Sequence, residues 1–249
     1  MSLQNIELSF GDHEVLKGVS LDVHRGETLC ILGGSGVGKS TVLRLILRLI
    51  HPTAGDVLIE GRDITTVSQD DVLRLRERMG MVFQGSALFD SLTVRDNVAF
   101  PLYEHTRQGD AEIEARVREV LTFVDLEPDE ILHLLPAELS GGMRKRVALA
   151  RAVVSRPDCI FYDEPHAGLD PVTADKIDRL IKRLESEHGI TNIVVTHEMR
   201  SVFRIADRVL FIRGGVVYWE GTAAELKVVE DPVLRDFIDG NSGTPWEQS

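Results

Sequence analysis

The sequence predicts an α/β fold, in which a mostly parallel, helix-flanked sheet is combined with an N-terminal antiparallel β layer and an inserted helical lobe. Three runs are almost continuous in apolar or β-favouring residues: TLCIL (28–32), CIFYD (159–163) and NIVVT (192–196). Parallel strands that helices cover on both faces have this composition. These runs therefore predict the parallel sheet.

Segments near both ends of the chain predict antiparallel strands. LQNIELSF (3–10) and VLKGVSLDV (15–23) alternate between apolar and polar residues, and Gly11-Asp12 stands between them. Such alternation is typical of a half-exposed layer. VLFIR (209–213) and VVYWEG (216–221), separated by two glycines, predict a hairpin.

The middle of the chain predicts helices. Between about residues 85 and 140 strand signals disappear, and apolar residues recur at helical spacing at Ile113, Val117, Val120, Leu121 and Val124. We therefore expect a single domain over residues 1–240, with a helical lobe at about 85–140 inserted in it. After Asp231 the periodicity is lost, and residues 241–249 form a tail. There, Trp246 docks on a partner subunit or belongs to an unattached terminus.

Composition excludes several classes of protein. The net charge of −12 argues against a nucleic-acid partner chosen by bulk electrostatics. Cys30 and Cys159 each lie in an apolar run, where a thiol behaves as a small hydrophobe, so we expect no disulfide or metal site there. No run reaches the roughly 20 apolar residues that span a bilayer, and the N-terminus lacks the pattern of a signal peptide. We expect a soluble, cytoplasmic chain.

A glycine-rich block after the first predicted parallel strand matches the P-loop pattern G-x-x-x-x-G-K-[ST], and a helical pattern follows it. In a P-loop, backbone N–H groups surround the β-phosphate, the lysine reaches the β/γ oxygens and the hydroxyl ligates Mg²⁺. An ordinary glycine-rich turn is the alternative. Kinases, GTPases, transport motors and DNA-repair ATPases share this loop. The residues are Gly33, Gly34, Ser35, Gly36, Gly38, Lys39, Ser40 and Thr41.

Polar residues at the ends of two other predicted strands fit the same chemistry. Asp163 and Glu164 end CIFYD, where one carboxylate can hold the Mg²⁺ shell and the next can orient or deprotonate the attacking water. A solvated loop is the alternative. His197 follows NIVVT, at the sheet edge where α/β folds bind ligands. It either contacts the γ-phosphate or water, or caps a turn.

These residues together resemble the ATP-binding cassette (ABC) ATPases from Phe10 to about Gly221. Besides the P-loop and CIFYDE, MVFQ is similar to the family's Q-loop, LSGGMRKR (139–146) to its signature, AGLD (167–170) to its D-loop, and His197 to its switch histidine. The resemblance implies an ABC ATPase fold with Glu164, His197 and Gln84 as catalytic residues. It also implies that Phe10 stacks on adenine, although a core aromatic on a strand fits the sequence as well.

The resemblance further implies that two copies pack head to tail around two ATP molecules. The P-loop of one copy and Ser140, Gly141 and Gly142 of the other then hold the same ATP, with Asp170 of the D-loop nearby. Helix N-termini favour anions, which suits this second half-site. A capped surface helix is the alternative for LSGGMRKR. The implied cofactor is Mg²⁺, held by Ser40, Gln84 and Asp163.

Within the family, Met143 in the signature, the segment after Gln84 and DPVLRDFIDG (231–240) are similar to the ATPases of Mla-type phospholipid transporters. This resemblance implies a peripheral position on the inner face of the bacterial inner membrane, with an integral membrane permease, an MCE-domain lipid-binding protein and a small accessory subunit as partners. ATPases of amino-acid-type importers and of iron–sulfur assembly are the alternatives. His166 departs from the family pattern, and it either meets the γ-phosphate across the dimer or is a loop residue.

Overall fold

The structure is a computed structural model that describes residues 1–241, so Trp246 lies outside the described residues. The chain divides into two compact units. Unit 1 comprises Met1–Val72 and the segment that begins at Ile193, and unit 2 comprises Leu73–Asn192. Within residues 1–241, no helix combines the length and the apolar character needed to cross a membrane.

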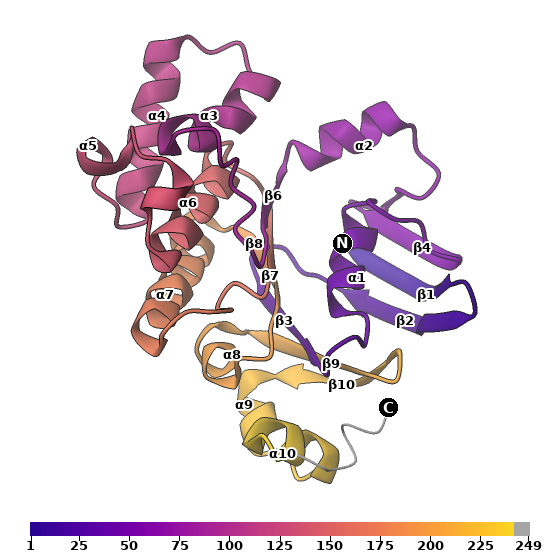
Figure 1. The fold of residues 1–249 in the computed structure, drawn as a ribbon. Helices are drawn as coiled ribbons and strands as arrows, with labels where there is room; N and C mark the ends of the chain where they lie inside the picture. The colour runs from indigo at the N-terminus through magenta and orange to yellow at the C-terminus, as the bar shows by residue number, and fades with distance from the viewer. Residues whose placement is uncertain (242–249) are drawn as a thin grey trace. The chain divides into compact units, whose positions relative to one another are not determined.

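The N-terminal part of unit 1 is a four-stranded antiparallel sheet in the order β2-β1-β4-β5. Figure 1 labels β2, β1 and β4 of this sheet. Along β1, Leu3, Ile6 and Leu8 are buried, whereas the residues between them are exposed. The predicted antiparallel, half-exposed layer is thus confirmed for β1 and β2. The strands are β1 (Ser2–Phe10), β2 (His13–Asp22), β4 (Ala54–Ile59) and β5 (Arg62–Asp63).

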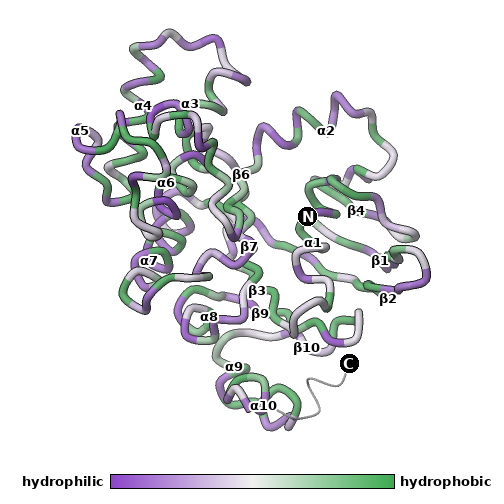
Figure 2. The backbone as a smooth tube through the Cα atoms, in the orientation of Figure 1, coloured by the Kyte–Doolittle hydropathy of each residue, from purple (hydrophilic) through white to green (hydrophobic). Residues whose placement is uncertain are grey.

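Unit 1 also contains strands of a second sheet, in the order β10-β9-β3-β8. β3 and β9 are parallel, and β9 and β10 form the predicted antiparallel hairpin. Every residue of β3 is buried, and its course is coloured hydrophobic in Figure 2, as expected for a strand covered on both faces. The strands are β3 (Thr28–Gly33), β9 (Arg208–Arg213), β10 (Val216–Thr222) and β8 (Thr191–Val195), which crosses the division between the units.

One expectation for the C-terminal segment is wrong, because a helix, α10 (Pro232–Asp239), follows Asp231. The Asp231 carboxylate accepts hydrogen bonds from the N–H groups of Val233 and Leu234, and Phe237 packs edge-on against Phe211 at 4.9 Å. An Asp N-cap followed by proline is a signal for the start of a helix. This signal identifies the helix even though the segment is too short to show a clear apolar period. The other helices wholly within unit 1 are α1 (Lys39–Ile46), α8 (Met199–Ile205) and α9 (Ala223–Lys227).

Unit 2 pairs two parallel strands with a group of helices. Described residues 85–140 contain helices and no strand, as the sequence predicts. α6 contacts α3, α4 and β6, and its residues Val147, Ala148 and Ala150 are fully buried. The elements are β6 (Met79–Val82), α3 (Val94–His105), α4 (Asp110–Phe123), α5 (Pro128–Ile131), the 3-10 helix Pro136–Glu138, α6 (Gly141–Val153), β7 (Cys159–Asp163) and α7 (Pro171–His188). α2 (Gln69–Arg76) spans the junction with unit 1.

Both cysteines are buried, and neither takes part in a disulfide in the structure. Burial raises the pKa of the Cys159 thiol, because an apolar environment disfavours the thiolate. Cys159 therefore serves as a small core residue.

A buried asparagine fastens the loop before α3 to that helix. The Asn97 side chain accepts a hydrogen bond from the Phe89 N–H at 2.8 Å and donates to the carbonyls of Phe89, Leu92 and Thr93 at 3.0–3.1 Å. Asn97 is fully buried, so water cannot take its place as the hydrogen-bond partner of these backbone groups.

We expect Asn97→Ala to destabilise the protein by about 2–4 kcal/mol, because several buried backbone groups lose their partner at once. The free energy of unfolding, measured by urea titration, checks this. The control Asn241→Ala removes an exposed amide that donates to the Asp236 carboxylate at 3.1 Å, and it should cost less than about 0.5 kcal/mol. Equal stability of the two variants would contradict the assignment.

Candidate functional site

The predicted phosphate loop lies in unit 1 between β3 and α1. Gly38 precedes the helix with φ +99°, a left-handed conformation that glycine adopts readily. A Cβ at Gly38 would also approach Leu16 Cδ2 to 2.7 Å. The buried Lys39 side chain turns back over the loop, where its ammonium donates to the carbonyls of Gly33 and Gly34 at 2.9 and 2.7 Å. The loop is therefore a compact cradle with a lysine charge inside it.

The structure brings His197 to the same edge of the sheet as this loop. β3 and β8 are neighbours, and the Thr196 N–H donates to the Ile31 carbonyl at 3.3 Å. His197 follows Thr196 directly, whereas Gly33 ends β3 two residues after Ile31. His197 is exposed, so its imidazole is accessible to a ligand at this edge.

Phe10 lies at the end of β1, where it pairs in register with His13 across the turn. Its ring is 54% exposed, so the alternative of a core aromatic is wrong. An exposed ring beside a turn has a free face on which a planar ligand can stack.

In unit 2, Asp163 ends β7 and Glu164 follows it, both partly exposed. The Glu164 backbone has φ +47°, an unusual conformation for a residue with a Cβ. The carbonyl of Glu164 accepts a hydrogen bond from the Ala167 N–H at 3.2 Å, which closes a turn behind it. The tight turn thus fixes the direction in which the carboxylate leaves the strand.

The signature segment and the predicted D-loop line one polar cavity of about 380 Å³ in unit 2. Ser140 caps α6 by accepting from the Met143 N–H at 3.2 Å. A Cβ at Gly142 would approach Thr173 Cγ2 to 2.5 Å, so glycine is required for this packing. Arg146 and Lys176 add positive charge. The cavity therefore suits an anion.

Asp170 borders the same cavity as the N-cap of α7. Its carboxylate accepts from the N–H groups of Val172 and Thr173 and from the Thr173 hydroxyl. These bonds to Thr173 and Val172 lower the pKa of Asp170, so the group stays ionised. Its role within the chain is to start the helix.

Lys145 is a polar residue of this region that sequence reasoning missed. It is buried, and its ammonium donates to the backbone carbonyl of Gln84. Burial lowers the pKa of Lys145, while the negative charges of Asp163 and Glu164 oppose that shift. A basic run such as MRKR indicates a solvated helix face, so no signal in the sequence singles out Lys145.

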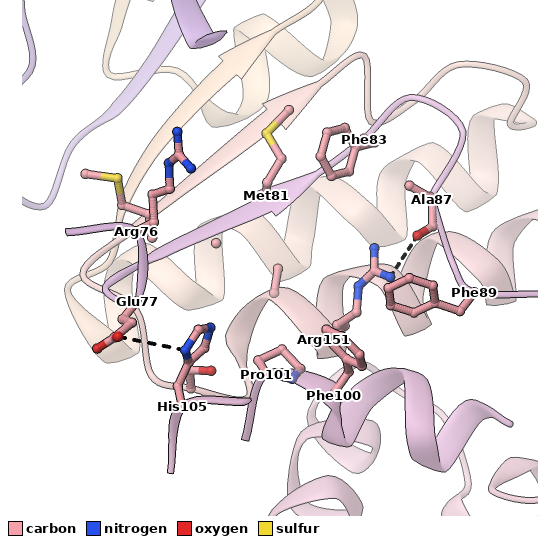
Figure 3. A pocket seen from close by; sticks show the side chains of 14 residues that line it. Arg76, Glu77, Met81, Phe83, Ala87, Phe89, Phe100, Pro101, His105 and Arg151 are labelled. Carbon is pink, nitrogen blue, oxygen red and sulfur yellow. Dashed lines mark hydrogen bonds and ion pairs between the residues drawn. The ribbon is translucent and has the colours of Figure 1, made fainter. Parts of the chain in front are cut away.

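A second cavity in unit 2, of about 320 Å³, is mainly apolar (Figure 3). Phe83, Phe89 and Phe100 line it and are 36–43% exposed, and the Phe89 and Phe100 ring centroids lie 4.8 Å apart. Arg151 packs over Phe89 and donates to the carbonyls of Ser86 and Ala87 at 3.0 and 2.8 Å. At the other end, Figure 3 shows His105 beside Glu77, with 3.8 Å between His105 Nδ1 and Glu77 Oε1.

Comparison with known proteins decides the family. The family model for the ABC transporter matches residues 16–167. This chain belongs to the ABC transporter family. It is 38% identical to the intermembrane phospholipid transport system ATP-binding protein MlaF of Escherichia coli K12, over 98% of this chain and 90% of that protein.

The chain is also similar to an ATP-binding protein of an import system and to a solved ABC cassette. It is 39% identical to the methionine import ATP-binding protein MetN of Carboxydothermus hydrogenoformans, over 95% of this chain and 71% of that protein. Among solved structures, the dimeric post-hydrolysis state of the ATP-binding cassette MJ0796 with ADP and Pi has a TM-score of 0.82 and 35% identity, covering 90% of this chain and 99% of that one. The ABC ATPase fold is thus confirmed, and the chain is an ATP-binding ABC ATPase.

Proposed function

We propose that this chain is the ATP-hydrolysing subunit of a multi-subunit transporter that moves phospholipid between the inner and outer membranes of a bacterium. The observation that carries the proposal is the match to MlaF along nearly the whole of both chains. A second MlaF, from Haemophilus influenzae, is 39% identical over 98% of this chain. Both matches support phospholipid as the substrate.

In this proposal, the residues of the nucleotide motifs have the roles that they have in the family. Lys39 binds the β- and γ-phosphates, Glu164 orients or deprotonates the attacking water, and His197 contacts the γ-phosphate. The residues that would hold Mg²⁺ are Ser40, Gln84 and Asp163, whose hydroxyl, amide and carboxylate oxygens are donors of the kind that this ion prefers. The ion would neutralise charge on the phosphate oxygens.

The working form is a homodimer that encloses two ATP molecules. Each ATP is held by Lys39 of one copy and by Ser140, Gly141 and Gly142 of the other. The cavity beside Ser140, with Arg146 and Lys176 in its lining, supports an anion at that half-site. Loss of the γ-phosphate after hydrolysis removes contacts from both copies, so the copies separate.

An integral membrane permease docks on the apolar cavity of unit 2, which positions the cassette on the inner face of the inner membrane. Three partly exposed phenylalanines in one cavity form the kind of apolar surface that marks a protein–protein contact. An MCE-domain lipid-binding protein and a small accessory subunit complete the transporter.

We expect Phe89→Asp to abolish co-purification of the permease, because it places a charge among the rings of this cavity, while the isolated subunit keeps ATPase activity within about threefold. The matched control is Val228→Asp, which introduces the same charge at a 71% exposed position of unit 1 and should leave co-purification unchanged. Full recovery of permease with Phe89→Asp would exclude this cavity as the docking surface.

A polar-solute importer is the second candidate, because the match to MetN is equally strong in identity. The nucleotide motifs serve both kinds of transporter, so the substrate has to be identified from the partners. A soluble ATPase of iron–sulfur assembly is the third candidate, and it would have no permease.

The test is purification of the tagged protein from detergent-solubilised native membranes, with the co-purifying proteins and lipids identified by mass spectrometry. A permease together with an MCE-domain protein and phospholipid is expected. A permease with a solute-binding protein would replace phospholipid by a polar solute, and soluble partners alone would overturn the transporter.

A further inference from the structure

The loop from Glu164 to Asp170 is folded as two consecutive turns. The Ala167 N–H donates to the Glu164 carbonyl at 3.2 Å, and the Leu169 N–H donates to the His166 carbonyl at 3.1 Å. Glu164 itself is held at φ +47°, where a residue with a Cβ stays only when its surroundings impose that conformation. Both turn bonds join backbone groups of the loop itself, so they do not attach the loop to the rest of unit 2.

The side chain in the middle of the loop supplies that restraint. His166 Nε2 and Asp178 Oδ1 are 2.7 Å apart, and the two side chains are only 4% and 1% exposed. Asp178 lies on α7, two helical turns beyond the Asp170 cap. The loop is therefore bound to α7 at its C-terminal end by Asp170 and at its centre by His166.

The second ring nitrogen of His166, Nδ1, makes no comparable bond within residues 1–241. His166 Nδ1 is buried and has no hydrogen-bond partner among the described residues. An Asp178 carboxylate that accepts from Nε2–H fixes the ring in one orientation. Burial of this pair is costly, and removing either partner leaves the other buried without this bond. A costly buried pair at this position, two residues after Glu164, indicates a function.

We propose that His166 is a positioning residue for Glu164, and that Asp178 is its anchor on α7. This rests on the proposed role of Glu164 as the residue that orients or deprotonates the attacking water. His166 acts through the turn: its bond to Asp178 keeps the loop closed, and the closed loop keeps the Glu164 backbone in its left-handed conformation. Release of the imidazole lets Glu164 return to an ordinary conformation, which redirects its carboxylate.

The test compares His166→Gln with His166→Asn, which differ by one methylene. The glutamine amide reaches the position of Nε2 and retains a donor to Asp178, whereas the asparagine amide is too short. We expect kcat of His166→Asn to fall at least about tenfold with KM for ATP within about twofold, because Lys39 and the phosphate loop are unchanged. His166→Gln should keep kcat within about threefold of the wild type.

Two further variants keep the test decisive. His166→Phe retains the ring and removes its N–H group, so it should reproduce the loss in kcat even if the asparagine variant does not fold. Asp175→Asn, on the same helix and in an exposed pair with Arg179, should leave kcat unchanged. Thermal unfolding shows which variants are folded at the assay temperature. A folded His166→Asn or His166→Phe with kcat within twofold of the wild type would overturn the proposal.

Glu164→Gln, assayed in parallel, separates this proposal from the one on which it rests. If Glu164→Gln loses turnover and the His166 variants do not, only the positioning role is wrong. If Glu164→Gln hydrolyses ATP normally, the role of Glu164 is wrong, and His166 has no catalytic group to position. Equal losses in kcat and in stability that glutamine fails to rescue would show that His166 serves folding alone.

Discussion

Replacing Lys39 by alanine is expected to abolish ATP binding at physiological ATP concentrations. The Lys39 ammonium is buried inside the phosphate loop, within hydrogen-bond distance of two loop carbonyls, so it is already in place for a phosphate. A hydrogen bond between charged groups contributes about 1.5–3 kcal/mol. Loss of two such bonds to the β- and γ-phosphates weakens binding by roughly a hundredfold or more.

Titration of a fluorescent ATP analogue measures this effect directly. The control Lys17→Ala removes an exposed lysine of β2 that pairs with Glu14 at 3.9 Å, and it should bind the analogue with unchanged affinity. Thermal unfolding with and without ATP gives an independent readout, because a ligand that binds only the folded state raises its stability. Binding by Lys39→Ala within threefold of the wild type would exclude Lys39 as a phosphate ligand.

The parts of the fold that the sequence predicts are those with a local signal. β3, β7 and β8 are almost continuous in apolar or β-favouring residues, and the sequence predicts all three where they occur. The sequence does not predict β4 and β6, because their residues are only partly buried and form no continuous apolar run. Their stability comes from pairing with β1 and β7, which lie far away in the chain.

The residues of the candidate site also fall into those that the sequence identifies and those that it does not. The phosphate loop, the acidic pair after β7 and the LSGG segment are each recognisable from residue type and spacing. Lys145 and Asp178 are not, because both stand in charged helical stretches that indicate a solvated face. In the folded chain each is buried and meets a group outside its own helix, the Gln84 carbonyl or the His166 ring.

Replacing Glu164 by glutamine is expected to leave ATP binding intact and to lower turnover at least about a hundredfold. Glutamine has the same length and can occupy the same turn after β7, but its amide cannot accept a proton from water. General bases contribute about 10²–10⁴-fold to enzymatic rates. Steady-state ATPase activity and titration of an ATP analogue, measured on the same preparation, check the two parts of this expectation separately.

The comparison that decides the role of Glu164 is with a glutamate on the same unit that lies away from the loop. Glu187→Gln makes the same change near the end of α7, where the side chain is 54% exposed and lies 3.7 Å from Arg183. It should retain full turnover. If both variants hydrolyse ATP at the wild-type rate, another residue activates the water, and the neighbouring Asp163 becomes the first to test. If both lose turnover equally, the loss reflects a general effect on unit 2, since Glu187 lies at the far end of the helix that Asp170 starts.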